Sequence, residues 1–322
     1  MTIAIITGVA GFIGSNLAKR CVEIGWDVHG IDNLSSGQMK FIDDISDKKN
    51  FKFYCTKFSD FNAKFYGLKH VDTAFHLAAR PRVSYSVEHP VETHDTNVFE
   101  TLKFLDQFRE TDTRIVFASS SSVYGDTKIR PTPESTLRNP KSPYALQKTH
   151  VEDYLKLYNE LYGLDSVALR FFNVFGPNQI GGSPYSCAVS AWMHAILSGG
   201  QCRSDGTGEQ TRDLCYVDNV VEACVLASQH LSPLRAEAFN VACGDSASNN
   251  DVLSTLKKHF PNMQTVAAPR RPGDVMHTQA DIAKIQRAFA YSPKVRVWEG
   301  VERTIEWYTQ NWDWIQQLKA RT

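Results

Sequence analysis

The chain has 322 residues, of which 42% are hydrophobic, and its 35 Lys and Arg residues balance 35 Asp and Glu residues. At roughly 150 residues per domain, this length predicts two lobes, or one large domain with a smaller one attached. A net charge of zero argues against a protein that binds nucleic acid or a membrane surface, because such proteins carry basic patches. An anionic ligand must therefore be held by local positive groups.

The seven cysteines are an odd number and include no C-x-x-C pair. This spacing fits neither a disulfide framework nor a zinc site, so we expect reduced thiols and no bound metal. The sequence begins with the apolar residues 3–6 without a basic leader, and no apolar run reaches the ~18 residues of a membrane span. These features predict a cytoplasmic protein without a membrane segment.

The first half of the sequence alternates short apolar runs with stretches of helical spacing. The expected strands are 3–7, 27–31, 51–54, 73–77, 114–118 and 166–169, and the expected helices are 14–24, 98–108 and 144–162. Strands that alternate with helices predict βαβ units. The expected fold is therefore α/β, with a doubly wound parallel sheet of the Rossmann type and helices on both faces.

The pattern changes after about Gly176. Residues 177–184 are rich in Gly, Pro and Asn, which is typical of a loop. After this loop we expect helices over 188–198 and 217–229, a strand over 238–241 and a helical stretch near the C-terminus. We predict one domain from residues 1–175, joined by about 213–241, and a smaller α/β domain mainly from residues 176–322.

A glycine-rich turn, Thr7-Gly-x-x-Gly-x-x-Gly14, follows the first expected strand. Glycines at positions 8, 11 and 14 permit a tight turn and a close approach of the backbone to a pyrophosphate at the start of a helix. Asp32 follows the second expected strand, 18 residues after Gly14, where an acid can bind ribose hydroxyls. Because this acid would repel a 2′-phosphate, the two features together predict NAD rather than NADP.

The pattern Tyr-x-x-x-Lys occurs twice. Tyr124 and Lys128 enclose a Gly-Asp turn and are followed by two prolines, whereas Tyr144 and Lys148 follow Ser-Pro at an expected helix start. Side chains four residues apart on a helix share a face. The second pair is therefore the candidate for chemistry, against the alternative of a surface tyrosine beside a solvated lysine.

A tyrosine needs help to act as a base, because its phenol has a pKa near ~10. A neighbouring ammonium group and the positive nicotinamide ring both lower that pKa. Ser120 lies in a run of four serines after an expected strand, and it can hydrogen-bond the same sugar hydroxyl. Such a run is also ordinary turn material. Ser120, Tyr144 and Lys148 are the candidate catalytic residues.

The order of several motifs resembles that of the extended short-chain dehydrogenase/reductases. These motifs are Thr7-Gly-x-x-Gly-x-x-Gly14, His76-Leu-Ala-Ala79, Asn97, Ser119–Gly125, Ser142-Pro-Tyr-Ala-x-x-Lys148, Leu169-Arg-Phe-Phe-Asn-Val-Phe-Gly-Pro177, Arg212-Asp-x-Cys-Tyr-Val-Asp218 and Arg271-Pro-Gly-Asp274. The chain is most similar to the UDP-hexose 4-epimerases, and within them to those acting on UDP-N-acetylglucosamine. The resemblance implies an enzyme that uses NAD to epimerise a UDP-hexose through a 4-keto sugar.

The resemblance also assigns residues to each ligand. Those implied for NAD are Gly8, Gly11, Phe12, Ile13, Gly14, Asp32, Asn33, Gly37, Phe58, Leu77, Ala78, Ala79, Asn97, Tyr144, Lys148 and Phe171. Those implied for the UDP-sugar are Val83, Ser120, Tyr144, Asn173, Val189, Arg212, Arg271, Asp274 and Thr278. Residues 1–175 would then bind NAD, and the C-terminal domain would hold most of the UDP-sugar.

Three positions bear on the type of reaction and the size of the sugar. Where related dehydratases and decarboxylases carry acids, this chain has Ser121 and Ser122, which favours epimerisation alone. Thr278 aligns with a position that limits the pocket in this family. A tyrosine there resembles enzymes confined to plain hexoses, and the smaller threonine resembles those admitting an N-acetyl group.

One position departs from the family pattern. The family usually has an Asp after the third strand that accepts a hydrogen bond from the adenine amino group, and this chain has Lys57 there. Lysine cannot accept that bond. Either Asp60, three residues later, replaces it, or backbone atoms alone read the adenine.

Two other functions remain open. A UDP-glucuronate 4-epimerase, or a related enzyme that modifies nucleotide sugars, would need an extra positive group for the carboxylate, which Arg80 and Arg82 could supply. A non-catalytic NAD-binding protein could keep the fold without turnover.

The family resemblance also implies a homodimer whose contact is built from helices of the first domain. The expected helices 98–108 and 144–162 carry apolar residues that could pack on a partner or only on the sheet. These residues are Phe99, Leu102, Leu105, Val151, Leu155 and Tyr158.

Overall fold

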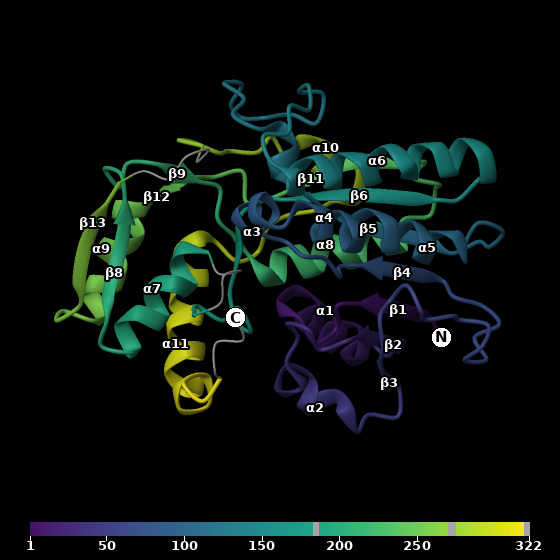
Figure 1. Ribbon diagram of the computed structural model, residues 1–322, viewed down its shortest axis with the longest axis horizontal. Helices are drawn as coiled ribbons and strands as arrows, with labels where there is room; N and C mark the ends of the chain where they lie inside the picture. The colour runs from purple at the N-terminus through teal and green to yellow at the C-terminus, as the bar shows by residue number, and fades with distance from the viewer. Residues whose placement is uncertain (183–186, 270–274, 319–322) are drawn as a thin grey trace.

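The centre of the computed structural model, which describes residues 1–182, 187–269 and 275–318, is a parallel sheet of seven strands (Figure 1). Its strand order is β11-β6-β5-β4-β1-β2-β3. The strands are β1 (Ile3–Thr7), β2 (Asp27–Asp32), β3 (Phe51–Cys55), β4 (Thr73–His76), β5 (Arg114–Ser120), β6 (Ser166–Phe171) and β11 (Glu237–Val241). The order reverses between β1 and β4, and this arrangement creates a crevice at the carboxyl ends of the strands. The predicted α/β fold with a doubly wound parallel sheet is confirmed.

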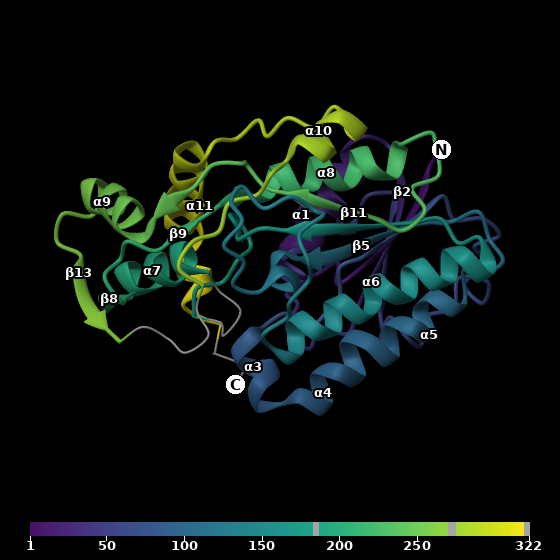
Figure 2. The same ribbon diagram turned by 90° about the horizontal axis from the view of Figure 1, so that it is seen from above.

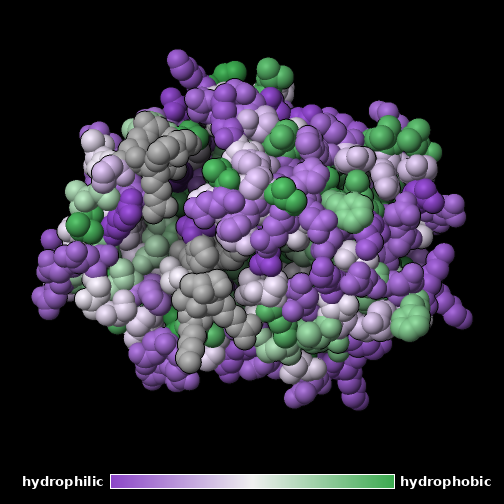
Figure 3. All heavy atoms as spheres, viewed as in Figure 1, coloured by the Kyte–Doolittle hydropathy of each residue, from purple (hydrophilic) through white to green (hydrophobic). Residues whose placement is uncertain are grey.

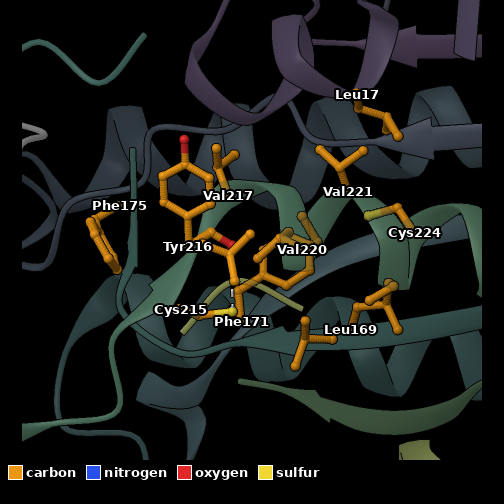
Figure 4. Close-up of a cluster of buried hydrophobic side chains, with 14 of the residues drawn as sticks. Leu17, Leu169, Phe171, Phe175, Cys215, Tyr216, Val217, Val220, Val221 and Cys224 are labelled. Carbon is orange, nitrogen blue, oxygen red and sulfur yellow. Dashed lines mark hydrogen bonds between the residues drawn. The ribbon is translucent and has the colours of Figure 1, made fainter. Parts of the chain in front are cut away.

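The central strands are apolar because helices cover both faces of the sheet. Every residue of β6 is buried. On one face, α1 (Phe12–Glu23) and α8 (Val217–Gln229) pack on the sheet through side chains such as Leu17, Val221 and Leu169, which Figure 4 shows between the two helices and β6. On the other face lie α5 (Glu100–Asp106) and α6 (Pro143–Tyr162), with Phe104 and Val151 in a second cluster. Figure 2 shows the sheet between these two helical layers.

Within the described residues, the C-terminal part adds four helices and small sheets beside the carboxyl ends of the main strands (Figure 1). Its helices are α7 (Ala188–Leu197), α9 (Asn249–His259), α10 (Ala283–Phe289) and α11 (Val297–Ile315). Its strands pair in twos: β8 (Gln201–Asp205) with β13 (Gln264–Ala268), β9 (Thr211–Arg212) with β12 (Ala247–Ser248), and β7 (Val174–Phe175) with β10 (Cys215–Tyr216). α10 instead packs on β11 and α8, so part of this region supports the large sheet.

The helix predicted over 98–108 is the C-terminal part of a longer helical segment, and only its predicted start is wrong. The chain forms α3 (Val83–Glu88) and then α4 (Pro90–His94), which continues through a π-helical turn (Asp95–Phe99) into α5. Pro90 occupies the first turn of α4, where the missing N–H of proline costs no hydrogen bond. The helical segment therefore begins at this proline, eight residues earlier than the apolar spacing predicts.

The two longest helices in the described part of the chain are α6, with 20 residues, and α11, with 19. Both contain several charged residues. Across residues 1–182, 187–269 and 275–318, no helix combines the length and the apolar character that crossing a bilayer requires.

Candidate active site

A large cavity opens at the carboxyl ends of the main strands. Its volume is about 2570 Å³, whereas pockets for one small ligand usually measure roughly 300–1,000 Å³. Its walls come from the turn between β1 and α1, the ends of β2 to β6, and residues 275–278. The cavity therefore has room for two ligands of nucleotide size placed end to end.

The glycine turn forms the floor of this cavity. Gly8 has a φ of +70°, and a Cβ on Gly14 would overlap the carbonyl oxygen of Gly8. Gly11 donates its N–H to Gly8 over 3.0 Å and caps the start of α1. Because the first N–H groups of a helix lack partners inside the helix, the start of α1 offers donors and a positive dipole to a phosphate.

Asp32, at the end of β2, faces the same cavity. Its carboxylate accepts the N–H groups of Ala10 (3.0 Å) and Leu34 (2.8 Å). Burial raises the pKa of Asp32, and these two hydrogen bonds oppose the rise. A Cβ on Gly37 would lie 2.8 Å from the carboxylate. Gly37 thus leaves room for Asp32; it is not part of the cavity wall, and its assignment to the cofactor stays a prediction.

Tyr144 and Lys148 enter the cavity from the first turns of α6. The helix starts where Ser142 accepts the N–H of Ala145 over 3.2 Å, with Pro143 in first position. Lys148 donates to the carbonyl oxygen of Ala118 over 2.7 Å, and its Nζ lies 5.8 Å from the centre of the Tyr144 ring. The predicted helix start and the shared face of the two side chains are confirmed.

Ser120 lies at the end of β5, where its side chain interacts with Tyr144. Burial raises the pKa of Tyr144 to about 12, and the bond to Ser120 opposes the rise. Burial also lowers the pKa of Lys148 to about 7, against the charge of Glu152. In the chain alone the phenol is therefore protonated at neutral pH, and a further positive charge in the cavity is needed to activate it.

The other Tyr-x-x-x-Lys pair is arranged differently. Tyr124 is 2% exposed and outside the cavity wall. Its hydroxyl donates to Asn240 over 2.6 Å and accepts from Arg170 over 2.8 Å. Because these contacts already satisfy the hydroxyl, the geometry favours Tyr144.

A buried ion pair supports the segment that carries Ser120. Glu152, one turn after Lys148, accepts from Ser119 (2.6 Å) and binds Arg170 through both of its oxygens (2.9 and 2.7 Å). The Glu152 and Arg170 side chains are 2% and 5% exposed. The pair ties α6 to β5 and β6, the elements that position the candidate residues. Sequence reasoning missed it because the partners are 18 and 33 residues apart.

Replacing Glu152 by glutamine should destabilise the protein by ~3–5 kcal/mol, because Arg170 would remain buried without its counter-charge. Urea unfolding followed by circular dichroism measures the loss. Asp153→Asn is the matched control, since Asp153 pairs with Arg138 at a half-exposed position, where such pairs contribute ~0–1 kcal/mol. Equal losses in the two variants would contradict this account.

The far end of the cavity is bordered by Asn173, Arg212 and Thr278. The Thr278 hydroxyl accepts from Asn173 Nδ2 (3.1 Å) and from the N–H of Asp213 (3.2 Å). Arg212 donates to the carbonyl oxygens of Thr211 and Met276. The predicted Arg271 and Asp274 lie outside the described residues.

Buried Asp213, which the sequence did not single out, holds this border together. Its carboxylate accepts the N–H groups of Cys243, Gly244 and Ala280 over 3.0–3.1 Å. It thereby joins the Thr278 segment to the end of β11.

Most predicted site residues share this one cavity. Those in its wall are Gly8, Gly11, Phe12, Ile13, Gly14, Asp32, Asn33, Phe58, Leu77, Ala78, Ala79, Val83, Ser120, Tyr144, Lys148, Phe171, Asn173, Arg212 and Thr278. Val189 is instead a core residue, 1% exposed. Asn97 is buried behind the wall, where it binds both backbone groups of Arg80 and the side chain of Gln147. Neither Val189 nor Asn97 lies in the cavity wall, and their assignments to a ligand stay predictions.

The residues after β3 include Lys57, which stands where the family usually has an Asp. Lys57 and Phe58 line the cavity, and Lys57 donates to Glu100 over 3.0 Å. Asp60 is not in the wall, and its nearest cation is Lys103 at 3.8 Å. The replacement of the missing acid by Asp60 stays a prediction.

Comparisons with known proteins agree with this geometry. The model of the NAD dependent epimerase/dehydratase family matches residues 4–242. A putative UDP-glucose 4-epimerase of Methanocaldococcus jannaschii is 33% identical over 312 residues, which is 95% of this chain and 98% of that protein. The crystal structure of a UDP-glucuronic acid 4-epimerase from Bacillus cereus, in complex with UDP-glucuronic acid and NAD, has a TM-score of 0.89 at 27% identity, over 96% of this chain and 99% of that one.

A second structure is a UDP-N-acetylglucosamine 4-epimerase from Methanobrevibacter ruminantium in complex with UDP-N-acetylmuramic acid. It has a TM-score of 0.90 and 34% identity, and the match covers 96% of this chain and 99% of that one. Both structures match the chain over nearly its full length, so the likeness extends across the main sheet and the C-terminal elements.

Proposed function

The chain belongs to the NAD-dependent epimerase/dehydratase family, and we propose that it interconverts UDP-N-acetylglucosamine and UDP-N-acetylgalactosamine by inverting C4 of the sugar. The observation that carries this proposal is the Ser120–Tyr144–Lys148 set inside a cavity large enough for NAD and a nucleotide sugar. Next to this set, Ser121 and Ser122 provide no acid for elimination or decarboxylation.

The cavity fits NAD, the cofactor of the family. The glycine turn and the start of α1 would hold its pyrophosphate, Asp32 its adenosine ribose, and Lys148 its nicotinamide ribose. When bound, NAD supplies an acceptor for the C4 hydride of the sugar, which makes the 4-keto sugar, and a donor that returns this hydride. All other tasks fall to the protein: it binds, orients and moves protons.

Tyr144 would take the proton of the 4-hydroxyl and later return it. Burial opposes the phenolate, but the Lys148 ammonium and the positive ring of the cofactor both favour it. Ser120, bound to Tyr144, would hydrogen-bond the same sugar oxygen. This arrangement would keep Tyr144 within reach of the 4-hydroxyl while the sugar turns its opposite face to the cofactor.

The UDP part would be anchored at the other end of the cavity. Arg212 suits diphosphate oxygens because its guanidinium donates several bonds at once, and Asn173 adds an amide donor. Arg271 and Asp274 complete the proposed set from the segment outside the described residues. Contacts remote from C4 leave the sugar free to turn between the two hydride transfers.

Two features of the wall favour an N-acetylhexosamine over a uronate. Thr278 is small, and its hydroxyl is held by Asn173 and Asp213, so it takes up little of the cavity beside Asn173. Arg80, one of the two cations considered for a carboxylate, lies 3.6 Å from Glu92. The negative charge of Glu92 compensates part of the positive charge of Arg80, which the carboxylate of a uronate would need as its partner.

Replacing Thr278 by tyrosine should therefore lower kcat/KM for UDP-N-acetylglucosamine by roughly 10- to 200-fold while affecting UDP-glucose much less. This range is what a few extra heavy atoms cost in a fitted pocket. Steady-state kinetics measure the ratio of kcat/KM for UDP-N-acetylglucosamine to kcat/KM for UDP-glucose. Thr278→Ser is the control, because serine is also small and keeps the hydroxyl. A tyrosine variant with the wild-type ratio would show that Thr278 does not limit the pocket.

The experiment that tests the proposed function uses three substrates in parallel. The purified protein is incubated without added NAD with UDP-N-acetylglucosamine, UDP-glucose or UDP-glucuronate, and the products are followed by proton NMR. We expect the 4-epimer of UDP-N-acetylglucosamine to form at the highest rate and the 4-epimer of UDP-glucose to form more slowly. Conversion of UDP-glucuronate alone would contradict the substrate assignment.

The proposal includes a homodimer formed through α4, α5 and α6. Of the six residues named from the sequence, Leu105, Val151 and Leu155 are buried in the chain's own core. Phe99, another of the six, is exposed in the π-helical turn between α4 and α5. Val91 of α4 and Leu157 and Leu161 of α6 are also exposed. In Figure 3 the surface is mainly hydrophilic, with hydrophobic side chains scattered over this face.

The dimer can be tested by light scattering at micromolar concentration. The wild type should have twice the chain mass, and Phe99→Glu should be a monomer. A monomeric wild type would reject the dimer.

A further inference from the structure

The sheet register shows where the adenine of NAD must lie. Asp32 pairs with Cys55 at the ends of β2 and β3, and the next residue, Thr56, donates its N–H to Asp32 over 3.2 Å. Tyr144 lies near the end of β5, on the other side of β1 and β4. An NAD molecule with its nicotinamide at Tyr144 and its adenosine ribose at Asp32 therefore points its adenine at the residues after β3.

Two charged side chains meet at this place. Lys57 follows β3, Glu100 begins α5, and both are in the cavity wall. The Lys57 Nζ donates to Glu100 Oε1 over 3.0 Å. The Glu100 side chain is only 11% exposed, whereas that of Lys57 is 53% exposed. The carboxylate is thus the buried member of the pair, and the ammonium group covers it from the solvent side.

We propose that Glu100 accepts the hydrogen bond of the exocyclic amino group of adenine, while Lys57 positions the Glu100 carboxylate. An amino group attached to a purine needs an acceptor, which a carboxylate is and an ammonium group is not. The contact with Lys57 uses Oε1, so Oε2 can still accept a bond. The pair thereby supplies the acid that position 57 itself lacks, from a helix 43 residues further along the chain.

The role of Lys57 follows from the burial of its partner. The Glu100 carboxylate is largely removed from water, and the Lys57 ammonium group is its counter-charge. The hydrogen bond from Lys57 to Glu100, together with the charge of Glu100, raises the pKa of Lys57, so the lysine remains a cation at neutral pH. Because Lys57 is half exposed, water can solvate it when Glu100 is altered. Substitution of Glu100 should therefore leave the fold intact.

The test compares NAD with nicotinamide hypoxanthine dinucleotide, in which a carbonyl oxygen replaces the adenine amino group. The chain freed of cofactor is mixed with equal concentrations of both, and the bound dinucleotides are released and measured by chromatography. The wild type should prefer NAD by roughly 10- to 100-fold, as expected for one hydrogen bond to a charged group. Glu100→Gln should reduce this preference to about 1, because an amide can accept from the amino group or donate to the carbonyl oxygen.

Two control variants complete the test. Glu92→Gln alters another carboxylate of the cavity wall, the one near Arg80, and should keep the wild-type preference. Lys57→Gln should lower the preference for NAD without abolishing it, since the Glu100 acceptor remains but loses the group that positions it. An unchanged preference in Glu100→Gln, or no preference in the wild type, would overturn the proposal. These results depend on NAD binding and not on the sugar, so they are independent of the UDP-sugar assays.

Discussion

Replacing Tyr144 by phenylalanine should lower epimerase turnover by about 10²- to 10⁴-fold, the usual contribution of a positioned general acid or base. The variant keeps the aromatic ring, which is 8% exposed and packed at the start of α6. It loses only the hydroxyl bound to Ser120. The fold and the UDP contacts are untouched, so the affinity for UDP-N-acetylglucosamine should remain within a few-fold of the wild type.

Calorimetric binding and steady-state turnover separate these two effects. Tyr124→Phe is the matched control, because Tyr124 also belongs to a Tyr-x-x-x-Lys sequence but binds Asn240 and Arg170 away from the cavity. We expect this control to lose about 1 kcal/mol of stability and to retain turnover. Full turnover in Tyr144→Phe, or loss of turnover only in Tyr124→Phe, would reverse the assignment.

Replacing Lys148 by methionine should reduce turnover at neutral pH by about 10- to 1,000-fold. A positive charge near an acid lowers its pKa by about 1–3 units, and Lys148 is the cation nearest to the Tyr144 ring, at 5.8 Å from its centre. Methionine fills much of the same volume at this buried position, which is 4% exposed. Without the cation the phenol is harder to ionise.

The pH–rate profile gives the sharper readout for this variant. The rise of kcat with pH reports ionisation of the base, so it should move to higher pH by about 1–3 units in Lys148→Met. A structural defect alone would lower the rate at every pH without moving the profile. Lys128→Met, in the exposed loop after Tyr124, is the control and should behave as the wild type. An unshifted profile in Lys148→Met would show that this lysine does not tune Tyr144.

Most of the main sheet could be predicted because its signal is local. An apolar run such as Ser166–Phe171 is buried along its whole length, and the Ser-Pro start of α6 is a local capping pattern. The small strands β8, β9, β12 and β13 could not be predicted in this way. They contain two to five residues and are largely polar or exposed, as in Gln201–Asp205. Their pairing depends on partners far away in the sequence.

In the candidate site, too, the residues marked by local patterns could be predicted and those that act through distant partners could not. The glycine turn and the Tyr144–Lys148 pair depend on neighbours within a few residues, so their spacing indicated their places in the cavity. Glu100, Glu152 and Asp213 act through partners 18 to 67 residues away, and no local pattern marks them. Val189, assigned by resemblance alone, lies in the core and outside the cavity wall.

The most direct test of the central claim follows the hydrogen on C4 of the sugar. The protein is incubated with UDP-N-acetylglucosamine in D₂O, and proton NMR records position 4 of the UDP-N-acetylgalactosamine formed. If the hydrogen leaves as hydride and returns within a closed site, with Tyr144 handling only the hydroxyl proton, the product keeps protium at C4. Deuterium at C4 of the product would mean that this hydrogen exchanges with solvent as a proton, and would contradict the account.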